Sequence, residues 1–376
     1  MPQMPPARIG AAFDEIDTPA LLIDLADFER NLDTMADHSR HMGVRLRPHG
    51  KTHKSPLVAA KQIARGAVGI CCQKVSEAEI FVAAGIADVL ISNEVVGAAK
   101  LARVASLARH AKIGVCADNA EAVQALAAAA DKARTVIEVL VEIDVGAGRC
   151  GVVPGRAAVA LAEEIARHRS LSFSGLQSYY GTAQHLRSPQ ERRDAIARAS
   201  ELTAETVYLL GKAGFPCRTV AGAGTGTYPL EAKSGVWNEI QPGSYIFMDA
   251  DYARNEPGSD APAFENALFV LATVMSLSPD RAILDAGHKA LSNDSGFPTV
   301  CGRPEVPYGR PSDEHGTLSI GGSPWRPKLG EKVLLIPGHC DPTVNLYDWY
   351  VGVRNFGSGD AYVEALWPVA ARGALA

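Results

Sequence analysis

The sequence predicts an α/β fold consisting of a (β/α)₈ barrel followed by a second, all-β domain. Over the first two thirds of the chain, short apolar runs alternate with alanine-rich amphipathic segments, which is typical of a barrel of roughly 250 residues. From about residue 264, strand-like runs joined by Gly, Pro and Asn replace the helical segments. A chain of 376 residues is long enough for both domains.

The first elements along the chain are a strand and a helix. Residues 18–24 form an apolar run, and residues 27–42 carry apolar side chains at helical spacing. We expect Asp27 to cap this helix. Because the barrel strands begin near Arg45, the N-terminal strand is left over. We therefore expect a strand near residues 12–23 to join the second domain.

Eight apolar runs supply the barrel strands, so we expect the barrel to span residues 24–253 and the β-rich domain residues 254–376. A doubly wound open sheet is the alternative, because alternation alone cannot show closure. The barrel runs are residues 44–46, 68–72, 89–92, 113–116, 137–143, 173–176, 219–221 and 239–241. The strands expected in the second domain are residues 264–275, 281–286, 316–320, 332–336, 347–353 and 362–368.

The composition and the hydropathy pattern argue against nucleic-acid and membrane partners. The formal charge of −5 and the isoelectric point near 6.1 leave no basic excess, which argues against nucleic acid and favours a small-molecule substrate. No apolar run approaches the roughly 20 residues of a membrane span, and residues 1–10 lack signal-peptide features, so we expect no membrane partner and a cytoplasmic location. The seven cysteines show no CxxC spacing, which suits reduced thiols.

Residues 47–54 read Arg-Pro-His-Gly-Lys-Thr-His-Lys and directly follow the strand-like residues 44–46. Because Pro48 cannot continue a helix, Lys51 is expected just past the carboxyl end of a strand, where barrels place their active groups. Its cationic and histidine neighbours favour the neutral, nucleophilic amine, which can form a Schiff base. A basic loop that binds an anion or is solvated is the alternative.

The other strand ends contribute further polar groups. A glycine-rich run at residues 221–227 and a Gly-Ser pair within residues 242–245 follow the last two barrel strands, where barrels commonly bind phosphate through backbone N–H groups. A phosphate anchor, a lysine and an arginine at one barrel mouth suggest pyridoxal 5′-phosphate, although a glycine run alone is more often a tight turn. The side chains after the strands are Lys51, Gln73, Ser92, Asn93, Asp118, Asn119, Asp144, Arg149, Gln177, Tyr179, Tyr180, His185, Thr225, Ser244 and Tyr245.

A second group of candidate ligands is the His-Cys-Asp run at residues 339–341. If this segment is extended, His339 and Asp341 point to one side while Cys340 faces away. One imidazole and one carboxylate make an open site, which favours Mn²⁺ or Mg²⁺ over a closed structural zinc site. A surface turn is the alternative for so short a motif.

Five motifs together resemble the D-threonine aldolase family, which belongs with alanine racemase among the barrel-type pyridoxal phosphate enzymes. The motifs are residues 47–54, Gly-Ile-Cys-Cys-Gln-Lys-Val-Ser-Glu-Ala at 69–78, Ile-Ser-Asn-Glu-Val-Val-Gly at 91–97, Val-Gly-Ala-Gly-Arg-Cys-Gly at 145–151 and Pro-Gly-Ser-Tyr-Ile-Phe-Met-Asp at 242–249. The resemblance runs from about Asp17 to Arg372. Gly50 and Ala223 depart from the usual pattern, but neither removes a functional group.

The resemblance implies specific roles. Lys51 would hold the cofactor and act as the base at Cα, and Arg149 would face the pyridine nitrogen. Further cofactor contacts would come from Gln73, Tyr179, Gly224, Thr225, Ser244 and Tyr245. His339 and Asp341 would bind the divalent metal. His185 would take the proton of the substrate hydroxyl, with His49, His53 and His288 as competing candidates.

The resemblance also implies the reaction, which is cleavage of D-threonine and D-allo-threonine to glycine and an aldehyde. A 3-hydroxy-D-aspartate aldolase, which releases glyoxylate, would look much the same. A D-serine-type dehydratase uses similar parts with a His-x-Cys metal pair, and a non-catalytic pyridoxal phosphate carrier would need only the lysine and the phosphate site. In the family, the β domain of one subunit closes the barrel mouth of another, so a homodimer is expected.

Overall fold

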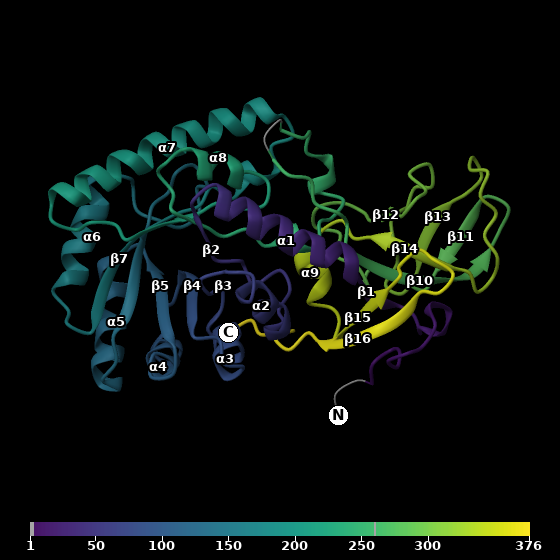
Figure 1. Ribbon diagram of the computed structural model, residues 1–376, viewed down its shortest axis with the longest axis horizontal. Helices are drawn as coiled ribbons and strands as arrows, with labels where there is room; N and C mark the ends of the chain where they lie inside the picture. Colours follow the sequence, from purple (N-terminus) through teal and green to yellow (C-terminus); the bar gives the residue numbers. More distant parts are fainter. Residues whose placement is uncertain (1–3, 259–260) are drawn as a thin grey trace.

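The computed structural model describes residues 4–258 and 261–376, which form a barrel and a second β-sheet side by side (Figure 1). The barrel strands are β2 (Arg45–Leu46), β3 (Ile70–Cys72), β4 (Asp88–Glu94), β5 (Lys112–Ala117), β6 (Ile137–Glu142), β7 (Leu171–Ser178), β8 (Thr219–Gly222) and β9 (Glu239–Ile240). All pair in parallel in the order β2-β9-β8-β7-β6-β5-β4-β3.

The barrel closes between its first two strands. A parallel bridge joins His49, just after β2, to Cys71 of β3, and the backbone N–H of Gly50 donates to the Cys71 carbonyl at 2.6 Å. The eight predicted strands are therefore present, and the alternative of an open doubly wound sheet is wrong.

Helices cover the outside of the barrel. They are α1 (Leu25–His41), α2 (Pro56–Ile63), α3 (Val75–Ala83), α4 (Ala98–Leu107), α5 (Ala120–Ala133), α6 (Arg156–Ala166), α7 (Pro189–Lys212) and α8 (Tyr228–Lys233). The short 3-10 turns are η1 (Phe13–Glu15), which packs against the second domain, and η2 (Thr182–His185), η3 (Ser244–Ile246) and η4 (Tyr252–Arg254), which follow barrel strands. The predicted cap of α1 is wrong by three residues. The Asp24 carboxylate accepts from the N–H groups of Ala26 and Asp27, so the helix begins at Leu25.

The second sheet is mostly antiparallel. Its strands are β1 (Ala20–Asp24), β10 (Leu268–Leu277), β11 (Arg281–Leu284), β12 (Thr299–Val300), β13 (Gly316–Ser319), β14 (Lys332–Ile336), β15 (Trp349–Arg354) and β16 (Tyr362–Pro368), with a short helix α9 (Cys340–Val344) after β14. The main path runs β12-β14-β10-β1-β15-β16, and β11 and β13 continue beside β10. The N-terminal strand β1 pairs with β10 and β15, in agreement with the expectation that it joins this domain.

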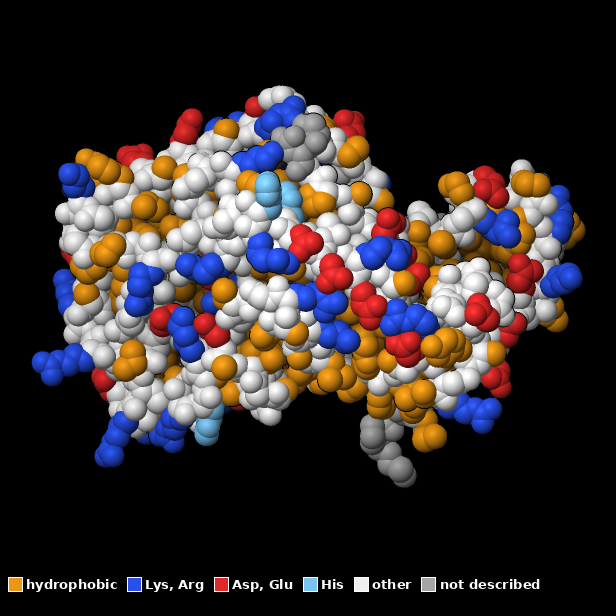
Figure 2. Space-filling view, viewed as in Figure 1, with side chains coloured by type: hydrophobic (Ala, Val, Ile, Leu, Met, Phe, Trp, Pro, Cys, Tyr) orange, Lys and Arg blue, Asp and Glu red, His pale blue; other side chains and the backbone are white. Residues whose placement is uncertain are grey.

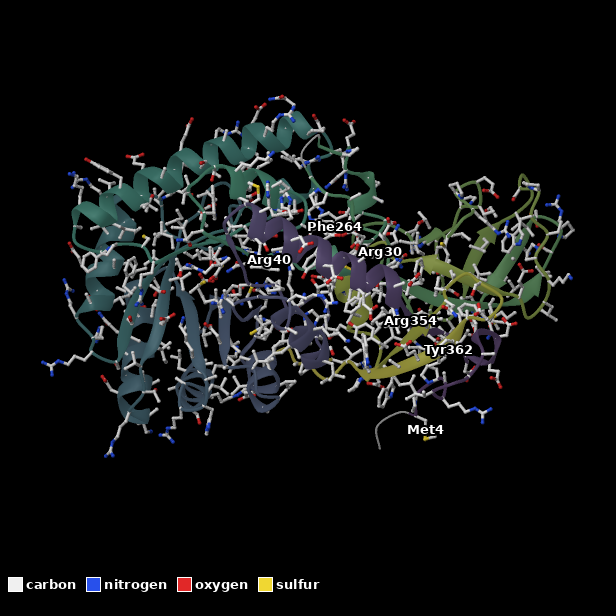
Figure 3. All side chains as sticks on the ribbon, in the orientation of Figure 1. Met4, Arg30, Arg40, Phe264, Arg354 and Tyr362 are labelled. Carbon is white, nitrogen blue, oxygen red and sulfur yellow. The ribbon has the colours of Figure 1, made fainter. Side chains whose placement is uncertain are left out.

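Helix α1 packs at the junction of the two domains. Phe28 of α1 stacks on Phe247 with ring centroids 6.1 Å apart, and Phe247 in turn contacts Tyr350 of β15 at 5.8 Å. These three side chains are completely buried, so truncation of Phe28 to alanine would cost roughly 3–5 kcal/mol. Arg354 of β15 lies near helix α1 (Figure 3), and its guanidinium pairs with Glu29 of that helix at 3.0 Å.

The second domain also holds the loop that follows β2. The Tyr350 hydroxyl donates to the His53 carbonyl at 2.7 Å, and the Ala371 N–H donates to the Lys54 carbonyl at 2.9 Å. The position of this loop therefore depends on both domains.

The surface carries both signs of charge. On the face shown in Figure 2, Lys and Arg side chains are interspersed with Asp and Glu, in agreement with the absence of a basic excess in the composition. Among the described residues, no helix has both the length and the apolar character required to cross a membrane.

Candidate active site

A cavity of about 360 Å³ opens at the carboxyl ends of the barrel strands and is bounded on one side by α9 of the second domain. Its size falls in the range of small-ligand sites. All predicted site residues except Tyr245 line it: Lys51, Gln73, Arg149, Tyr179, His185, Gly224, Thr225, Ser244, His339 and Asp341.

Lys51 meets a carboxylate in this cavity. Its Nζ lies 3.7 Å from Oδ2 of Asp341. Burial alone would lower the pKa of Lys51, but the negative charge of Asp341, with smaller contributions from Tyr179 and Cys340, outweighs burial, so the pKa lies above its ordinary value. The expectation that neighbouring cations keep the free amine neutral is therefore wrong for the protein without ligands.

The cations next to Lys51 in sequence are paired elsewhere. Arg47 is buried and pairs with Glu239 at 2.8 Å and Asp88 at 2.7 Å. Lys54 is also buried and pairs with Glu77 at 2.6 Å. Neither charge is left to repel the Lys51 ammonium, which explains why the simple crowding argument fails.

The loops after β8 and β9 form a narrow cradle at one end of the cavity. A Cβ at Gly224 would lie 2.6 Å from Oε1 of Gln184, and a Cβ at Gly243 would lie 2.3 Å from Oγ1 of Thr52. Within residues 4–258 and 261–376, the backbone N–H groups of Gly224 and Thr225 have no protein acceptor. These close backbone approaches and free donors fit a phosphate group.

The preceding residue in this cradle is strained. Ala223 has a φ of 67°, in the left-handed region that favours glycine. This conformation turns the chain sharply between β8 and Gly224.

Tyr245 is the exception among the predicted cofactor contacts. Its ring lies in the hydrophobic core beside Phe264, and its hydroxyl accepts from Nε2 of Gln62 at 3.0 Å. Only its backbone reaches toward the cradle, since its N–H donates to Oγ1 of Thr225 at 3.1 Å. The ring therefore packs in the core and does not enter the cavity.

Arg149 and Tyr179 line another wall. The Arg149 guanidinium lies 5.8 Å from the centre of the Tyr179 ring and 3.8 Å from a carboxylate oxygen of Glu142, the last residue of β6. Burial, together with the nearby Glu94 carboxylate, raises the pKa of Glu142 to about 8. An arginine at this position would hold a ring nitrogen without readily protonating it.

Acidic groups lie close together behind this wall. Ligand atoms of Glu94, Asp118 and Cys150 lie within 4.8 Å of one another and could in principle hold a metal ion. Glu94 is the last residue of β4, and Asp118 and Cys150 follow β5 and β6, whereas His339 and Asp341 belong to the second domain. The sequence analysis did not single out this group as a metal site.

His339 and Asp341 share the cavity, although not for the predicted reason. The segment is not extended, because His339 caps α9 and Asp341 lies in its first turn. The His339 Nδ1 lies 2.7 Å from Asp294 Oδ2, which leaves Nε2 as the ligand atom. The positive charge that faces Asp341 in this structure is the Lys51 ammonium. An imidazole oriented by a carboxylate, next to a second carboxylate, fits a divalent cation.

Charge governs the pKa values of these ligands. Burial alone would raise the pKa of Asp341, but the charges of Lys51 and His339 hold it below its ordinary value. Burial alone would lower the pKa of His339, but Asp341 and Asp294 raise it. Cys340 is completely buried, and burial raises the pKa of its thiol, so it remains a poor metal ligand.

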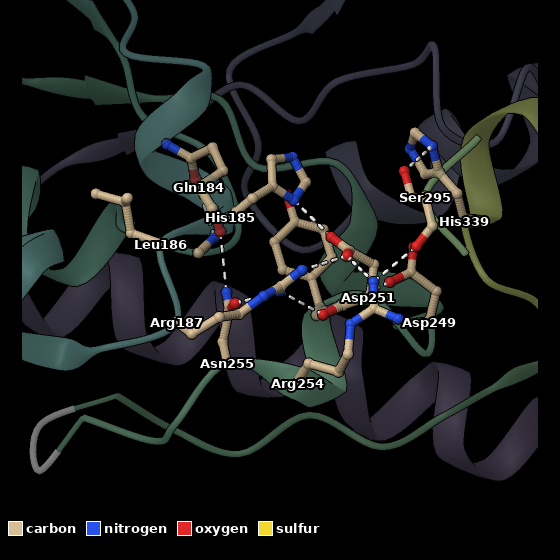
Figure 4. A network of polar contacts seen from close by, with 12 residues as sticks. Gln184, His185, Leu186, Arg187, Asp249, Asp251, Arg254, Asn255, Ser295 and His339 are labelled. Carbon is tan, nitrogen blue, oxygen red and sulfur yellow. Dashed lines mark hydrogen bonds and ion pairs between the residues drawn. The ribbon is translucent and has the colours of Figure 1, made fainter. Parts of the chain in front are cut away.

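His185 lies at the end of η2, with its ring against Tyr252 and its Nδ1 2.5 Å from Asp251 Oδ2 (Figure 4). Of the competing histidines, His49 lines the cavity but is buried, with both ring nitrogens in hydrogen bonds and its pKa well below the ordinary value because of burial. Burial lowers the pKa of His53 to about 3, and His288 lies exposed outside the cavity. His185 is thus the best placed of the four.

Three residues that contact the predicted site residues were missed by sequence reasoning. Asp251, Tyr252 and Asp294 contact predicted site residues, but only Tyr252 lines the cavity. Asp251 and Tyr252 follow the last barrel strand in the same stretch as Ser244, so their position was a weak signal. Asp294 lies in an irregular loop of the second domain, where no periodic pattern indicated it.

The chain is similar to known proteins along almost its whole length. Residues 23–251 match the family described as alanine racemase, N-terminal domain, and residues 267–353 match the putative serine dehydratase domain. A D-threonine aldolase from an Arthrobacter species is 48% identical over 371 residues, which cover 98% of this chain and 96% of that protein. A 3-hydroxy-D-aspartate aldolase from Paracoccus denitrificans (strain Pd 1222) is 46% identical over 375 residues, which cover 98% and 95%.

A solved structure is similar along the whole chain. The crystal structure of D-threonine aldolase from Filomicrobium marinum matches with a TM-score of 0.97 and 53% identity, and the match covers 99% of this chain and 100% of that one. The chain therefore belongs to the D-threonine aldolase family and has its alanine-racemase-type barrel.

Proposed function

We propose that the protein is a pyridoxal phosphate- and divalent-metal-dependent aldolase that cleaves D-3-hydroxy amino acids, including D-threonine and D-allo-threonine, to glycine and an aldehyde. The observation that carries the proposal is that one cavity contains Lys51, His185 and the His339 and Asp341 pair beside a phosphate cradle. The similarity to D-threonine aldolases over almost the whole chain supports it.

The cavity residues divide into two binding groups. Gly224, Thr225 and Ser244 would hold the phosphate, and Lys51 would hold the cofactor through its amine. Gln73, Arg149 and Tyr179 would contact the cofactor ring. Pyridoxal phosphate, when bound, supplies a conjugated ring that withdraws electrons from Cα. His339 and Asp341 would hold Mn²⁺ or Mg²⁺, which supplies positive charge that makes a nearby hydroxyl easier to deprotonate.

The protein side chains then move protons at two atoms. His185 takes the proton from the β-hydroxyl, the Cα–Cβ bond breaks, and the hydroxyl oxygen becomes the carbonyl oxygen of the aldehyde. The electron pair left on Cα takes a proton from Lys51, which gives glycine. Atoms balance, because D-threonine yields one glycine and one acetaldehyde without an oxidant or reductant.

A 3-hydroxy-D-aspartate aldolase is the second candidate. Lys74 is exposed at the rim of the cavity, as the residue that caps α3, and its ammonium could pair with a β-carboxylate. The relative from Paracoccus denitrificans that bears this name is nearly as similar as the D-threonine aldolase from Arthrobacter.

Product analysis on a panel of D-configured β-hydroxy amino acids tests the proposal. Glycine with acetaldehyde from D-threonine supports the aldolase, whereas a strong preference for 3-hydroxy-D-aspartate with release of glyoxylate supports the second candidate. Pyruvate from D-serine without glycine would indicate a dehydratase. A lack of turnover on every substrate would leave only a pyridoxal phosphate carrier.

We also propose a homodimer located in the cytoplasm. Val96 and Val153, which follow barrel strands β4 and β6, expose 70% and 75% of their surface and would be covered by the β domain of a second copy. All seven cysteines are unpaired, which supports a reducing compartment. Sedimentation velocity tests the assembly, because a monomer at micromolar concentration would contradict it.

A further inference from the structure

The carboxylate of Asp251 divides its two oxygens between different partners. Oδ2 lies 2.5 Å from Nδ1 of His185, and Oδ1 accepts from Nη2 of Arg187 at 2.5 Å and from Nη2 of Arg254 (Figure 4). The Asp251 side chain is only 5% exposed, and it lies behind His185, outside the residues that line the cavity. Of the described residues that the carboxylate contacts, only His185 lines the cavity.

Additional bonds fix the backbone on both sides of this contact. Nη1 of Arg187 donates to the Asp251 carbonyl at 2.7 Å and to Oδ1 of Asn255 at 2.6 Å. The Asn255 amide in turn donates to the Gln184 carbonyl at 2.9 Å, next to His185. With two arginines on Oδ1 and a further hydrogen bond at its own carbonyl, Asp251 has little freedom to rotate.

This arrangement determines which imidazole nitrogen carries a proton. Burial alone would raise the pKa of Asp251, but Arg187, His185 and Arg254 hold it below its ordinary value. An ionised carboxylate only accepts hydrogen bonds, so the shared proton resides on Nδ1 of His185. In the neutral imidazole, Nε2 then keeps the lone pair that a base requires.

We infer that Asp251, clamped by Arg187 and Arg254, is the positioning residue that keeps His185 in the Nδ1–H form with Nε2 available as the base for the β-hydroxyl. This inference rests on the proposed function for the role of His185, but the His185–Asp251 contact itself does not. Asp251 touches neither substrate nor cofactor, and its effect passes through the imidazole.

The segment that contains Asp251 and Arg254 also connects His185 to the second domain. The Asp251 N–H donates to the Gly338 carbonyl at 3.2 Å, and Arg254 donates to the Ser295 carbonyl at 2.6 Å. Gly338 precedes His339, and the Ser295 hydroxyl lies 3.4 Å from Nδ1 of His339. The same short segment therefore sets the position of the base relative to the proposed metal ligands.

The first test is the kinetics of Asp251→Asn in the holoenzyme, with D-threonine as substrate. An asparagine amide can donate to Nδ1 and would place the imidazole proton on Nε2, so we expect kcat to fall by about 100-fold or more while KM changes by less than about threefold. Exchange of the glycine Cα proton in deuterated water should persist, because it needs no hydroxyl base. A kcat within about threefold of the wild type would overturn the inference.

Glu164→Gln is the matched control. Glu164 of α6 is also a buried carboxylate beside a histidine and an arginine, with Nε2 of His168 at 3.4 Å and Nη1 of Arg167 at 2.5 Å, but it lies outside the cavity. We expect this variant to lose stability and to keep its kcat within about threefold. An equal loss of kcat in both variants would reduce the effect of Asp251 to general destabilisation and would overturn the inference.

A double-mutant cycle separates positioning from any other role. In a His185→Ala background, the change Asp251→Asn should alter kcat by less than about threefold, because the imidazole it positions is gone. A second fall of about 100-fold in that background would mean that Asp251 acts on another group.

The tautomer of His185 is measured directly by long-range ¹⁵N–¹H correlation NMR on histidine-labelled protein loaded with pyridoxal phosphate and Mg²⁺, with His185→Gln for assignment. The inference predicts the Nδ1–H form in the wild type and the Nε2–H form in Asp251→Asn. An Nε2–H form in the wild type would overturn it even if Asp251→Asn does not fold. Because this measurement needs no turnover, it remains decisive if the wild type cleaves none of the tested substrates and the proposed function fails.

Discussion

Nζ of Lys51 and Oδ2 of Asp341 lie 3.7 Å apart, although one residue follows the first barrel strand and the other lies in the first turn of a helix of the second domain. The lysine that would hold the cofactor thus pairs with a carboxylate that would hold the metal. The two halves of the proposed site form only when the domains dock, and the buried contacts of Phe28 with Phe247 and Phe247 with Tyr350 stabilise that docking.

Lys51 should be the residue that carries the cofactor. Borohydride reduction of the holoenzyme followed by peptide mapping should place the label on Lys51, because it is the lysine in the cavity opposite the phosphate cradle. Lys54 is held by Glu77 at 2.6 Å and is buried, so it serves as an internal comparison. A label on Lys54, Lys74 or Lys289 would contradict the proposed site.

Removal of the metal should abolish cleavage but leave the cofactor bound. The phosphate cradle belongs to the barrel, whereas His339 and Asp341 belong to the second domain, so a chelator should remove activity without loss of cofactor absorbance. Addition of Mn²⁺ should restore turnover. Full activity after exhaustive dialysis against chelator would exclude a metal role for this pair.

Substitutions at neighbouring positions should separate the metal ligand from the thiol. Asp341→Ala should behave like the metal-free enzyme, with a kcat reduced by at least about 100-fold. Cys340→Ala should keep kcat within about threefold, because this thiol is buried and lies beside Asp341 without lining the cavity. A severe loss of activity in Cys340→Ala would favour the dehydratase-type metal pair.

Stereochemical selectivity should be strict at Cα and looser at Cβ. Lys51 would reach Cα from one face of the cofactor, so it should exchange the Cα proton of D-amino acids and spare the L-series. The hydroxyl at Cβ would meet only His185 and the metal. The rates for D-threonine and D-allo-threonine should therefore differ less than the rates for D- and L-threonine. Equal cleavage of the L-series in a chiral product assay is the opposing result.

Glu231 should make the free energy of unfolding depend on pH. Its side chain is buried, and burial raises its pKa from about 4.5 to about 7. Between these values the unfolded chain loses the proton first, so stability is greatest below pH 4.5 and is lost as pH rises through 7, by up to about 3 kcal/mol.

Thermal unfolding of Glu231→Gln tests this dependence. The variant should raise Tm by a few degrees at about pH 8.5 and change it little at about pH 5, because glutamine carries no proton that titrates in this range. Glu121→Gln, at an exposed position in the first turn of α5, should change neither value and serves as the control. A constant difference between wild type and Glu231→Gln at both pH values would mean that Glu231 is not the titrating group.

Local patterns in the chain were sufficient for the order and type of most elements. Each of the eight barrel strands overlaps one of the predicted apolar runs. Strands β14 and β16 have the predicted limits of residues 332–336 and 362–368. Strand ends also indicated most of the cavity residues, because parallel strands bring their carboxyl ends to one face. This information is carried by residues within a few positions of one another.

Local sequence patterns did not predict the short elements and their ends correctly. Helix α9 has five residues, too few to show a helical period, so the His339 to Asp341 segment was expected to be extended. The cap of α1 is Asp24 and not the predicted Asp27, because the helix starts directly at the end of β1. The ring of Tyr245 lies in the core and not in the cavity, because it packs beside Phe264.

Contacts between segments that are distant in sequence determine the electrostatics of the site. Proximity in sequence placed Arg47 and Lys54 next to Lys51, but partners on distant strands and helices neutralise both charges. His185 and Asp251 are 66 residues apart in the chain, and no spacing rule connects them. Protonation depends on charges a few ångströms away in space, and the folded chain brings those charges from segments that the sequence keeps apart.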